Sequence, residues 1–320
     1  MSTPAAVHEL ARDLLAGLDR VVIGHGEAKE SLVACLLAGG HALIEGVPGT
    51  GKTLLALGLS RLAGCSFRRI QFTPDLMPID LIGTNILDQR RNEFTFMPGP
   101  VFAEVLLADE INRTPPRTQS ALLEAMQERA VTIDGVRRAL PRPFFVIATQ
   151  NPIEFEGTYP LPEAQRDRFL MRISVGYPDA DDEVGILRSY AAGRSLHEQV
   201  LGSLTPLADP GRISEAQDVI AAQIRVEDRL LRYVRDLVAA TRSDSAVQLG
   251  AGPRAGIAIL AASRALAAIR GRDFIIPDDI KGTIPLVLSH RIVLAAESEM
   301  EGGTVAETIS RITTAVEIPR

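Results

Sequence analysis

Short apolar runs alternate with amphipathic stretches over the first 178 residues of the chain. The runs predict strands at 41–45, 67–72, 103–109, 144–149 and 170–175. The third and fourth runs are continuously apolar, which is typical of parallel strands buried on both faces. Helical periodicity lies between the runs, at 54–62 and 118–129. Strands that alternate with helices predict an α/β fold built on a parallel sheet.

Two patterns between the predicted sheet strands favour β-hairpins. Residues 131–136 alternate around Asp134-Gly135, and Asp-Gly is a strong hairpin signal. Residues 85–96 have extended ends around a charged centre at 90–93. We expect both hairpins to project from the α/β core, and the charged centre is more simply explained as a solvated tip than as a binding patch.

The character of the sequence changes after Tyr177-Pro178. Residues 179–320 are rich in Ala, Leu, Ile, Arg and Glu, with helical periodicity and few strand signals. A chain of 320 residues is long enough for about two domains. We therefore expect an α/β domain at 1–178 and a second, helical domain at 179–320.

Composition excludes several classes of protein. With 46% apolar and 23% charged residues the chain is typical of a globular protein. Its net charge of −6, its 4% aromatic content and its lack of Trp argue against nucleic-acid binding. The longest charge-free stretch, 31–44, is shorter than the roughly 18 residues of a membrane span. The N-terminus lacks the basic region of a signal peptide.

The two cysteines, Cys35 and Cys65, match neither a metal-binding spacing nor a disulfide framework. We interpret them as small buried apolar residues in a reducing cytosol, and therefore expect a cytoplasmic protein. The histidines are scattered without ligand spacing, so a metal site built on them is not expected; they are His8, His25, His41, His197 and His290.

The segment GVPGTGKT at 46–53 fits the pattern G-x-x-x-x-G-K-[ST] between a predicted strand and a predicted helix. Its glycines let backbone N–H groups converge on phosphate oxygens, and the helix start adds its positive end. Lys52 is expected to reach the β- and γ-phosphates of a bound nucleotide, and the Thr53 hydroxyl to ligate Mg²⁺. A lysine in a first helical turn opposes the helix dipole, which a bound polyphosphate would explain. A glycine-rich turn with a chance lysine is the weaker alternative. The expected ATP-binding residues here are Gly46, Val47, Pro48, Gly49, Thr50, Gly51, Lys52, Thr53 and Leu54.

The predicted strand 103–109 ends in two adjacent acids, Asp109 and Glu110. Adjacent carboxylates at the end of a buried strand repel each other unless a bound cation or a water network offsets the repulsion. In phosphoryl transfer Asp109 would hold Mg²⁺ and Glu110 would polarise the attacking water. A strand end that simply reaches solvent is less favoured beside a phosphate loop.

The fourth predicted strand ends in the polar residues Thr149, Gln150 and Asn151 before a proline. The Asn151 amide could orient the attacking water or sense the γ-phosphate. It could equally only terminate a strand before proline, and the residues alone leave both interpretations open.

These motifs together resemble the AAA+ ATPases, and within them the MoxR family of the helix-2-insert clade. The resemblance covers nearly the whole chain and is most specific from 106 to 169. It is carried by GVPGTGKT at 46–53, LLADEINRTPPRTQSALLEAMQE at 106–128, ATQNPIEFEGTYPLPEAQRDRF at 148–169, GPRA at 252–255 and IPLVLSHRI at 284–292.

The resemblance implies a parallel sheet with strand order 5-1-4-3-2 and a helical lid. In that order the fourth strand lies between the first and third, so Asn151 would sit between the phosphate loop and Asp109-Glu110. The hairpin at 85–96 is similar to the helix-2 insert and that at 131–136 to the pre-sensor insert. Val22, Ile23 and Gly24 are similar to the segment that lies against adenine.

Three arginines, Arg166, Arg168 and Arg254, are further candidate site residues. By resemblance Arg168, placed at the end of a helix begun at Pro162, matches the arginine finger that reaches the neighbouring subunit's γ-phosphate. Position 166 is usually apolar in such motifs and is arginine here, so Arg166 stays a second candidate. A helix C-terminal cation stabilised by the dipole is the structural alternative for Arg168.

Arg254 follows Gly252-Pro253, the expected start of a helix. A positive charge in the first turn of a helix is unfavourable because it opposes the helix dipole. A residue that is unfavourable for its own helix is typical of functional sites. By resemblance Arg254 is sensor 2, an ATP-binding residue that ties the lid to the γ-phosphate. A plain surface arginine is the alternative.

The resemblance implies an ATP-hydrolysing remodelling ATPase that uses ATP and Mg²⁺. Such proteins form homo-oligomers, commonly hexameric rings, and mature or activate partner proteins that often carry a von Willebrand factor A domain. A metal-chelatase-like motor and an MCM-like DNA motor are related alternatives, and the acidic balance of the chain counts against the second. A scaffold that binds ATP without hydrolysing it is opposed by the intact acids, by Asn151 and by Arg168.

Overall fold

The computed structural model describes residues 3–90, 92–151, 158–192, 202 and 204–319. The five predicted apolar runs form one parallel sheet in the order β2-β5-β8-β1-β9. Numbered along the chain as first to fifth, these strands stand in the expected order 5-1-4-3-2, which is therefore confirmed. The strands are β1 (Ala42–Glu45), β2 (Phe67–Gln71), β5 (Val105–Asp109), β8 (Phe145–Gln150) and β9 (Met171–Ser174).

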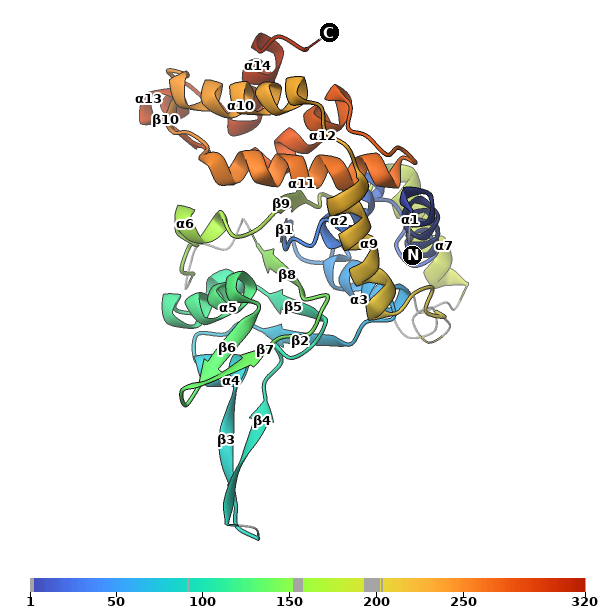
Figure 1. Cartoon of the computed structure of the whole chain (residues 1–320), viewed down its shortest axis with the longest axis vertical. Coiled ribbons are helices and arrows are strands. Elements are labelled where there is room, and N and C mark those ends of the chain that lie inside the picture. Colours follow the sequence, from blue (N-terminus) through green and yellow to red (C-terminus); the bar gives the residue numbers. More distant parts are fainter. Residues whose placement is uncertain (1–2, 91, 152–157, 193–201, 203, 320) are drawn as a thin grey trace.

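Both faces of this sheet are covered, because neighbouring residues of the central strands β5, β8 and β1 enter different hydrophobic cores. In β1, Ala42 and Ile44 belong to one core, while Leu43 belongs to the other. The first core includes α1 (Pro4–Asp19), α2 (Gly26–Leu37) and α3 (Lys52–Leu62). The second lies under α4 (Pro78–Ile82) and α5 (Pro116–Glu128). Figure 1 shows these two layers of helices on either side of the strands.

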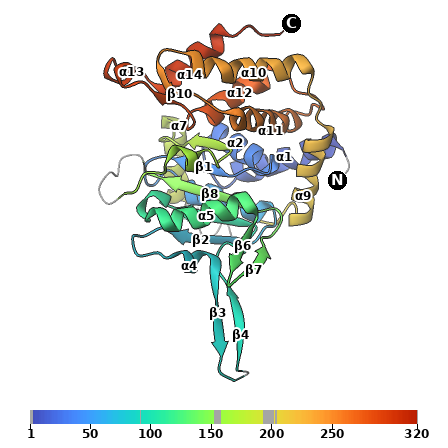
Figure 2. The same cartoon turned by 60° about the vertical axis from the view of Figure 1, so that its left-hand side comes forward.

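Two hairpins leave the core where the sequence predicts them. β3 (Gly83–Asp88) and β4 (Glu93–Pro98) pair antiparallel and extend far from the sheet in both views (Figures 1 and 2). β6 (Ala130–Ile133) and β7 (Val136–Ala139) form the second hairpin. Its turn residues Asp134 and Gly135 both have positive φ, 50° and 78°, which is the geometry that Asp-Gly favours.

A helical region lies beyond the β9 edge of the sheet, at the opposite end from the β3–β4 hairpin (Figure 1). This region is helical as expected and also contains one short strand pair, in which β10 (Val247–Leu249) and β11 (Val293–Leu294) run antiparallel. Its helices are α10 (Asp228–Ser243), α11 (Pro253–Ile269), α12 (Pro277–Leu288), α13 (Ala296–Met300) and α14 (Val305–Ala315).

Four further described elements are the single turn η1 (Ile111–Arg113) after β5, α6 (Glu163–Arg166) before β9, and α7 (Ala180–Ala191) and α9 (Pro210–Gln223). The last two lie between the sheet and the helical region along the chain. The change of sequence character after Pro178 coincides with Asp179, whose side chain caps α7. α9 packs against α1, α2 and α11. Within the described part of the chain, no helix combines the length and apolar character that crossing a membrane requires.

Candidate functional site

The loop between β1 and α3 depends on its glycines for its shape. Gly49 and Gly51 both have φ of +83°, a conformation that strains other residues. A Cβ at Gly46 would lie 2.2 Å from the backbone oxygen of Val175, so any side chain there would clash. The loop ends at Lys52, the first residue of α3, and therefore places the positive end of that helix beside the loop amides.

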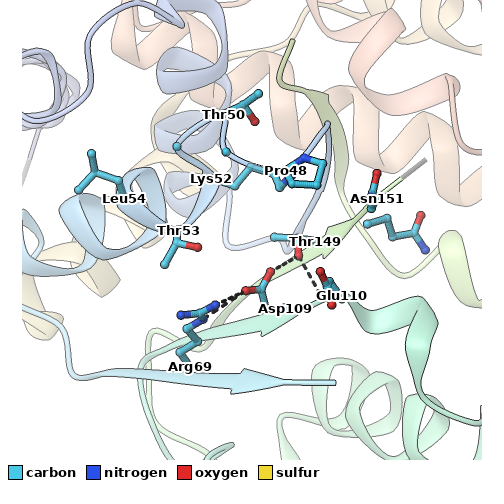
Figure 3. A pocket seen from close by; sticks show the side chains of 13 residues that line it. Pro48, Thr50, Lys52, Thr53, Leu54, Arg69, Asp109, Glu110, Thr149 and Asn151 are labelled. Atoms are coloured by element: carbon cyan, nitrogen blue, oxygen red, sulfur yellow. Dashed lines mark hydrogen bonds and ion pairs between the residues drawn. The ribbon is translucent and has the colours of Figure 1, made fainter. Parts of the chain in front are cut away.

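A cavity of about 470 Å³ opens in front of this loop, at the carboxyl ends of β5 and β8. Figure 3 shows the loop, the start of α3 and the ends of the two strands converging on it. The structure brings together here most of the residues that the sequence singles out. The lining residues are Pro48, Gly49, Thr50, Gly51, Lys52, Thr53, Leu54, Arg69, Asp109, Glu110, Thr149, Gln150 and Asn151.

Lys52 bonds to its own loop. Its Nζ donates to the backbone oxygens of Gly46 and Val47 at 2.6 and 2.8 Å. Burial lowers the pKa of the Lys52 ammonium, while the nearby carboxylates of Asp109 and Glu110 act in the opposite direction. The ammonium is thus held at the mouth of the loop. An anion that binds there would replace the two carbonyl oxygens as its hydrogen-bond partner.

Asp109, the last residue of β5, is 9% exposed and has polar partners on both carboxylate oxygens. Arg69 donates to Oδ2 through Nη2 at 2.7 Å and Nε at 3.2 Å. The Thr149 hydroxyl donates to Oδ1 at 2.5 Å. These contacts come from the strands on either side of β5, as Figure 3 shows.

Glu110 has a left-handed backbone, with φ of 57° and ψ of 52°. Such a conformation in a residue other than glycine is strained and clusters at functional sites. Its N–H donates to the Thr149 hydroxyl at 2.9 Å. Its Oε2 accepts from Gln71 Nε2 at 2.6 Å and from Arg113 Nη1 at 3.0 Å. The side chain is therefore held at the rim of the cavity by two donors.

Arg69, Gln71 and Thr149 were not identified from the sequence as site residues. A signal was present, because the predicted order 5-1-4-3-2 places the second strand beside the third. Gln71 pairs in register with Asp109, and Arg69 lies two positions before it on the same face of β2. Polar residues at the end of β2 could therefore have been assigned to the site.

Asn151 follows β8 directly, lines the cavity and is 7% exposed. Since β8 lies between β1 and β5, the amide stands between the phosphate loop and Asp109-Glu110. Pro152, the residue after it in the sequence motif, lies outside the described residues.

Val22 and Ile23 occupy a different place. Val22 is buried in the core that includes α1, and Ile23 faces α7, where a Cβ on Gly185 would lie 3.4 Å from its Cγ2. The described lining of the phosphate-loop cavity includes neither of them.

Two of the three arginines gather in a second, smaller cavity of about 210 Å³, lined by Met126, Gln127, Asp167, Arg168 and Arg254. Arg254 lies in the first turn of α11, and its Nη1 is 3.7 Å from Asp167 Oδ2. Arg168 Nη1 donates to the backbone oxygen of Leu123 in α5 at 2.7 Å. Among the described residues, the two cavities share no lining residue.

The expectation that Arg168 closes a helix is wrong. α6 ends at Arg166, Asp167 caps it, and Arg168 lies in the segment between α6 and β9. Stabilisation by the dipole of α6 is therefore not what places Arg168. Arg166 instead pairs with Glu163 one turn earlier, at 3.3 Å.

The cavity is chemically suited to a hard cation beside a phosphate. Thr53 and Asp109 offer a hydroxyl and a carboxylate, the oxygen ligands that Mg²⁺ prefers, next to the phosphate loop. Elsewhere, the described residues include no cluster of three or more His, Cys, Asp or Glu side chains that could hold a metal ion.

Two family profiles match the chain. The family described as "ATPase family associated with various cellular activities (AAA)" matches residues 41–171, which include the phosphate-loop cavity. The "AAA lid domain" matches residues 239–312, from the end of α10 into α14.

Relatives align over nearly the full length. Chaperone MoxR1 of Mycobacterium tuberculosis is 46% identical over 325 residues, covering 99% of this chain and 84% of that protein. The uncharacterized protein YeaC of Bacillus subtilis is 42% identical, covering 98% of this chain and 96% of the relative. Protein MoxR of Paracoccus denitrificans is 32% identical, covering 91% of each.

The fold agrees with these relationships. A crystal structure of a protein from Cytophaga hutchinsonii, assigned to the ATPases, superposes with a TM-score of 0.90 and 37% identity. The match covers 99% of this chain and 97% of the other. Similarity that runs through the phosphate loop, both acids and the lid at these levels of identity places the chain in the MoxR family of AAA+ ATPases.

Proposed function

We propose that the protein hydrolyses ATP with Mg²⁺ and uses the cycle to remodel partner proteins as a ring. One observation carries the proposal: the phosphate loop with Lys52, the acids Asp109 and Glu110, and Asn151 come from three separate segments and line a single cavity. Binding alone would not require a strained acid beside a second acid at the phosphate-facing edge of the sheet.

Each residue has a distinct task in this proposal. The loop amides and Lys52 bind the β- and γ-phosphates. Thr53 and Asp109 would hold Mg²⁺, which when bound neutralises charge that develops on the phosphate oxygens. Glu110 accepts a proton from the attacking water, and Asn151 orients that water or contacts the γ-phosphate. Val22 and Ile23 remain a proposal for the adenine end of the nucleotide.

Glu110 is not free to act in the arrangement observed. Gln71 and Arg113 both donate to its Oε2, so this oxygen is already occupied by two hydrogen bonds. We propose that these contacts are exchanged when the γ-phosphate arrives, so that hydrolysis starts only on a filled site.

The position of Arg168 supports a ring. Arg168 and Arg254 lie in a cavity of their own, with Arg254 side-chain exposure of 66%. If both contact a γ-phosphate, the simplest source is the phosphate-loop cavity of a neighbouring subunit, which requires head-to-tail contacts that close into a ring. We propose six subunits, and Arg168 rather than Arg166 as the finger, because Arg166 is paired within α6.

The remodelling activity is proposed from the relatives, one of which is named a chaperone. Relatives named MoxR that align over nearly the whole chain make a metal-chelatase-like or MCM-like motor the less favoured alternative. We propose a protein client or adaptor with a von Willebrand factor A domain. We also propose a cytoplasmic location, supported by the free, buried thiols of Cys35 and Cys65; burial raises the pKa of Cys65 to about 12.

The test separates binding from hydrolysis. Lys52→Ala should largely abolish ATP binding measured by titration calorimetry, because the cation on the phosphates is lost. Glu110→Gln should bind ATP with nearly unchanged affinity, hydrolyse it very slowly and accumulate as rings in size-exclusion chromatography. Equal ATP affinities for the two variants would contradict the assignment.

The same Glu110→Gln variant, which binds ATP without hydrolysing it, tests the proposed client protein. An ATP-loaded Glu110→Gln ring should retain a protein with a von Willebrand factor A fold from its own cell lysate, whereas Lys52→Ala should not. Recovery of nucleic acid by the trapped ring would instead favour the DNA-motor alternative.

A further inference from the structure

One buried arginine joins the end of α12 to the segment that carries Arg168. The side chain of Arg291 is 5% exposed. Its Nε donates to Asp167 Oδ1 at 2.7 Å, and its Nη2 to the backbone oxygens of Asp167 and Phe169 at 3.1 and 2.7 Å. Its Nη1 donates to the backbone oxygen of Leu170 at 3.2 Å. These contacts bracket Arg168 on both sides along the chain.

The contact set uses the whole guanidinium. The fifth oxygen belongs to Val287 in α12, 2.6 Å from Nη1. His290 Nε2 lies beside this contact set, 3.0 Å from the Phe169 oxygen and 2.8 Å from Arg291 Nη1. The five N–H groups of Arg291 then meet five oxygens. Lysine has only three donors on one nitrogen and cannot reproduce this fork.

Arg168 itself reaches in another direction. Its Nη1 bonds to Leu123 in α5, while its backbone lies between the carbonyls that Arg291 holds. The other oxygen of Asp167 pairs with Arg254 from α11. Two lid elements, α11 and the end of α12, therefore converge on the residue that precedes Arg168.

The same end of α12 is also tied to the phosphate loop. Arg172 in β9 donates to the backbone oxygen of Ser289 at 3.1 Å and pairs with Glu45 at 2.5 Å. Glu45 is the last residue of β1, directly before Gly46. Residues 289–291 thus contact the segment that carries Arg168 directly, and they are connected through Arg172 to the strand that leads into the nucleotide loop.

We propose that Arg291 is a positioning residue, which sets the direction of Arg168 and makes the lid and Arg168 move as one unit. The proposal rests on the proposed function, in which Arg168 contacts the γ-phosphate of a neighbouring subunit. A displacement of the lid in one subunit then changes the position of its Arg168 relative to the phosphate-loop cavity of the neighbouring subunit.

Arg291→Lys is the first test, because it keeps the charge and most of the stem while losing the fork. A misplacement of roughly 1 Å costs about 10²-fold in rate, so we expect kcat to fall by about that factor. The KM for ATP should stay within about twofold, since the subunit's own phosphate loop is intact.

Arg272→Lys is the matched control. Arg272 pairs with the fully buried Asp279 near the start of α12, through Nη1 and Nη2 at 2.5 and 2.6 Å. Its hydrogen bonds to described residues stay within the lid. It should lower Tm as much as Arg291→Lys and leave kcat within about twofold. A similar loss of kcat in both variants would assign the effect to general lid damage and overturn the proposal.

A double-mutant cycle with Arg168→Ala tests whether Arg291 acts through Arg168. If Arg291 acts through Arg168, then Arg168→Ala combined with Arg291→Lys has the same kcat as Arg168→Ala alone. Losses that multiply, or an unchanged kcat for Arg291→Lys beside a defective Arg168→Ala, would overturn the positioning role only. An unchanged kcat for Arg168→Ala would overturn the finger itself, and the positioning role with it.

A second variant keeps the cycle usable if Arg291→Lys does not fold. Asp167→Ala removes the Nε partner but leaves the three backbone oxygens of the segment. We expect a smaller loss of kcat that likewise disappears in the Arg168→Ala background. A loss that persists there would contradict the proposal.

Discussion

Arg69 of β2 holds the carboxylate of Asp109 at the end of β5, with Nη2 at 2.7 Å from Oδ2. The guanidinium is half exposed, while the Asp109 side chain is 12% exposed. A cation that binds to Asp109 must therefore share or displace Arg69, so the two strands together control access to the proposed Mg²⁺ ligand.

Replacing Arg69 should tighten cation binding. The pair is partly solvated and contributes about 0.5–1 kcal/mol, so Arg69→Gln should raise the affinity for Mn²⁺ about two- to fivefold. Electron paramagnetic resonance of Mn²⁺ added to the ADP-loaded protein measures this. Arg68→Gln is the control, because it removes the same charge from the neighbouring position of β2, which points to the other face. Equal changes in both variants would mean that only net charge matters.

A shared active site predicts complementation between two inactive variants. Arg168→Ala and Glu110→Gln homo-oligomers should both be nearly inactive, since removing an arginine finger costs about 10³- to 10⁵-fold in GTPases. In an equal mixture, a working interface takes Glu110 from the Arg168→Ala subunit and Arg168 from the Glu110→Gln subunit. Random head-to-tail mixing produces that pairing at roughly a quarter of interfaces, and ATPase activity should rise toward that fraction.

A finger that acts within its own subunit gives the opposite result, because every subunit then lacks one essential group. A labelled-subunit control must show that rings exchange. Exchange without recovery of activity would reject Arg168 in trans and make Arg166 the next residue to replace.

Arg254 should discriminate between nucleotides only in the assembled ring. ATP alone carries a γ-phosphate, and a charge-assisted contact to it contributes about 1.5–3 kcal/mol, or roughly ten- to a hundredfold in affinity. Arg254→Ala should lose that much ATP affinity relative to ADP in rings, and almost none in dilute, dissociated subunits. Titrations at two protein concentrations measure this, with Arg264→Ala on the same helix as control. Equal loss for ATP and ADP would indicate a damaged lid.

The stability of the α/β core should depend on pH through His41. Burial lowers the pKa of His41 to about 4, with the Arg129 charge acting in the same direction and its bond to Met126 opposing. The unfolded chain titrates near 6.5, so the stabilisation is complete above that pH and is lost as the pH falls toward 4. The loss between pH 7.5 and 5 is roughly 2 kcal/mol.

His41→Asn isolates this contribution, because Asn can still accept from the Val146 N–H that His41 Nδ1 binds. Urea unfolding at both pH values should show a smaller decrease for the variant than for the wild type. Burial also lowers the pKa of His290, but that effect is common to both proteins and cancels in the difference. Identical pH dependence would contradict the assignment to His41.

Much of the fold was predictable because the decisive signals are local. Apolar runs mark the sheet strands, Asp134-Gly135 marks a turn, and the spacing from Gly46 to Lys52 marks a phosphate loop. The strand order came from the family resemblance rather than from periodicity, because hydrophobic patterning does not say which strands are neighbours. Once the order was expected, the meeting of Asp109, Glu110 and Asn151 at one sheet edge followed.

The sequence by itself determined the α/β class, the phosphate loop, the paired acids and the family, all of which rest on residue types at fixed spacing. The tertiary structure alone decided that Arg69 and Gln71 hold the two acids, and that Arg254 lies with Arg168 rather than beside the phosphate loop. It also decided that the Arg291 side chain forms hydrogen bonds with a segment more than a hundred residues earlier in the chain. Such contacts depend on how packed elements aim long side chains across a core, and neither spacing nor periodicity along one segment encodes that direction.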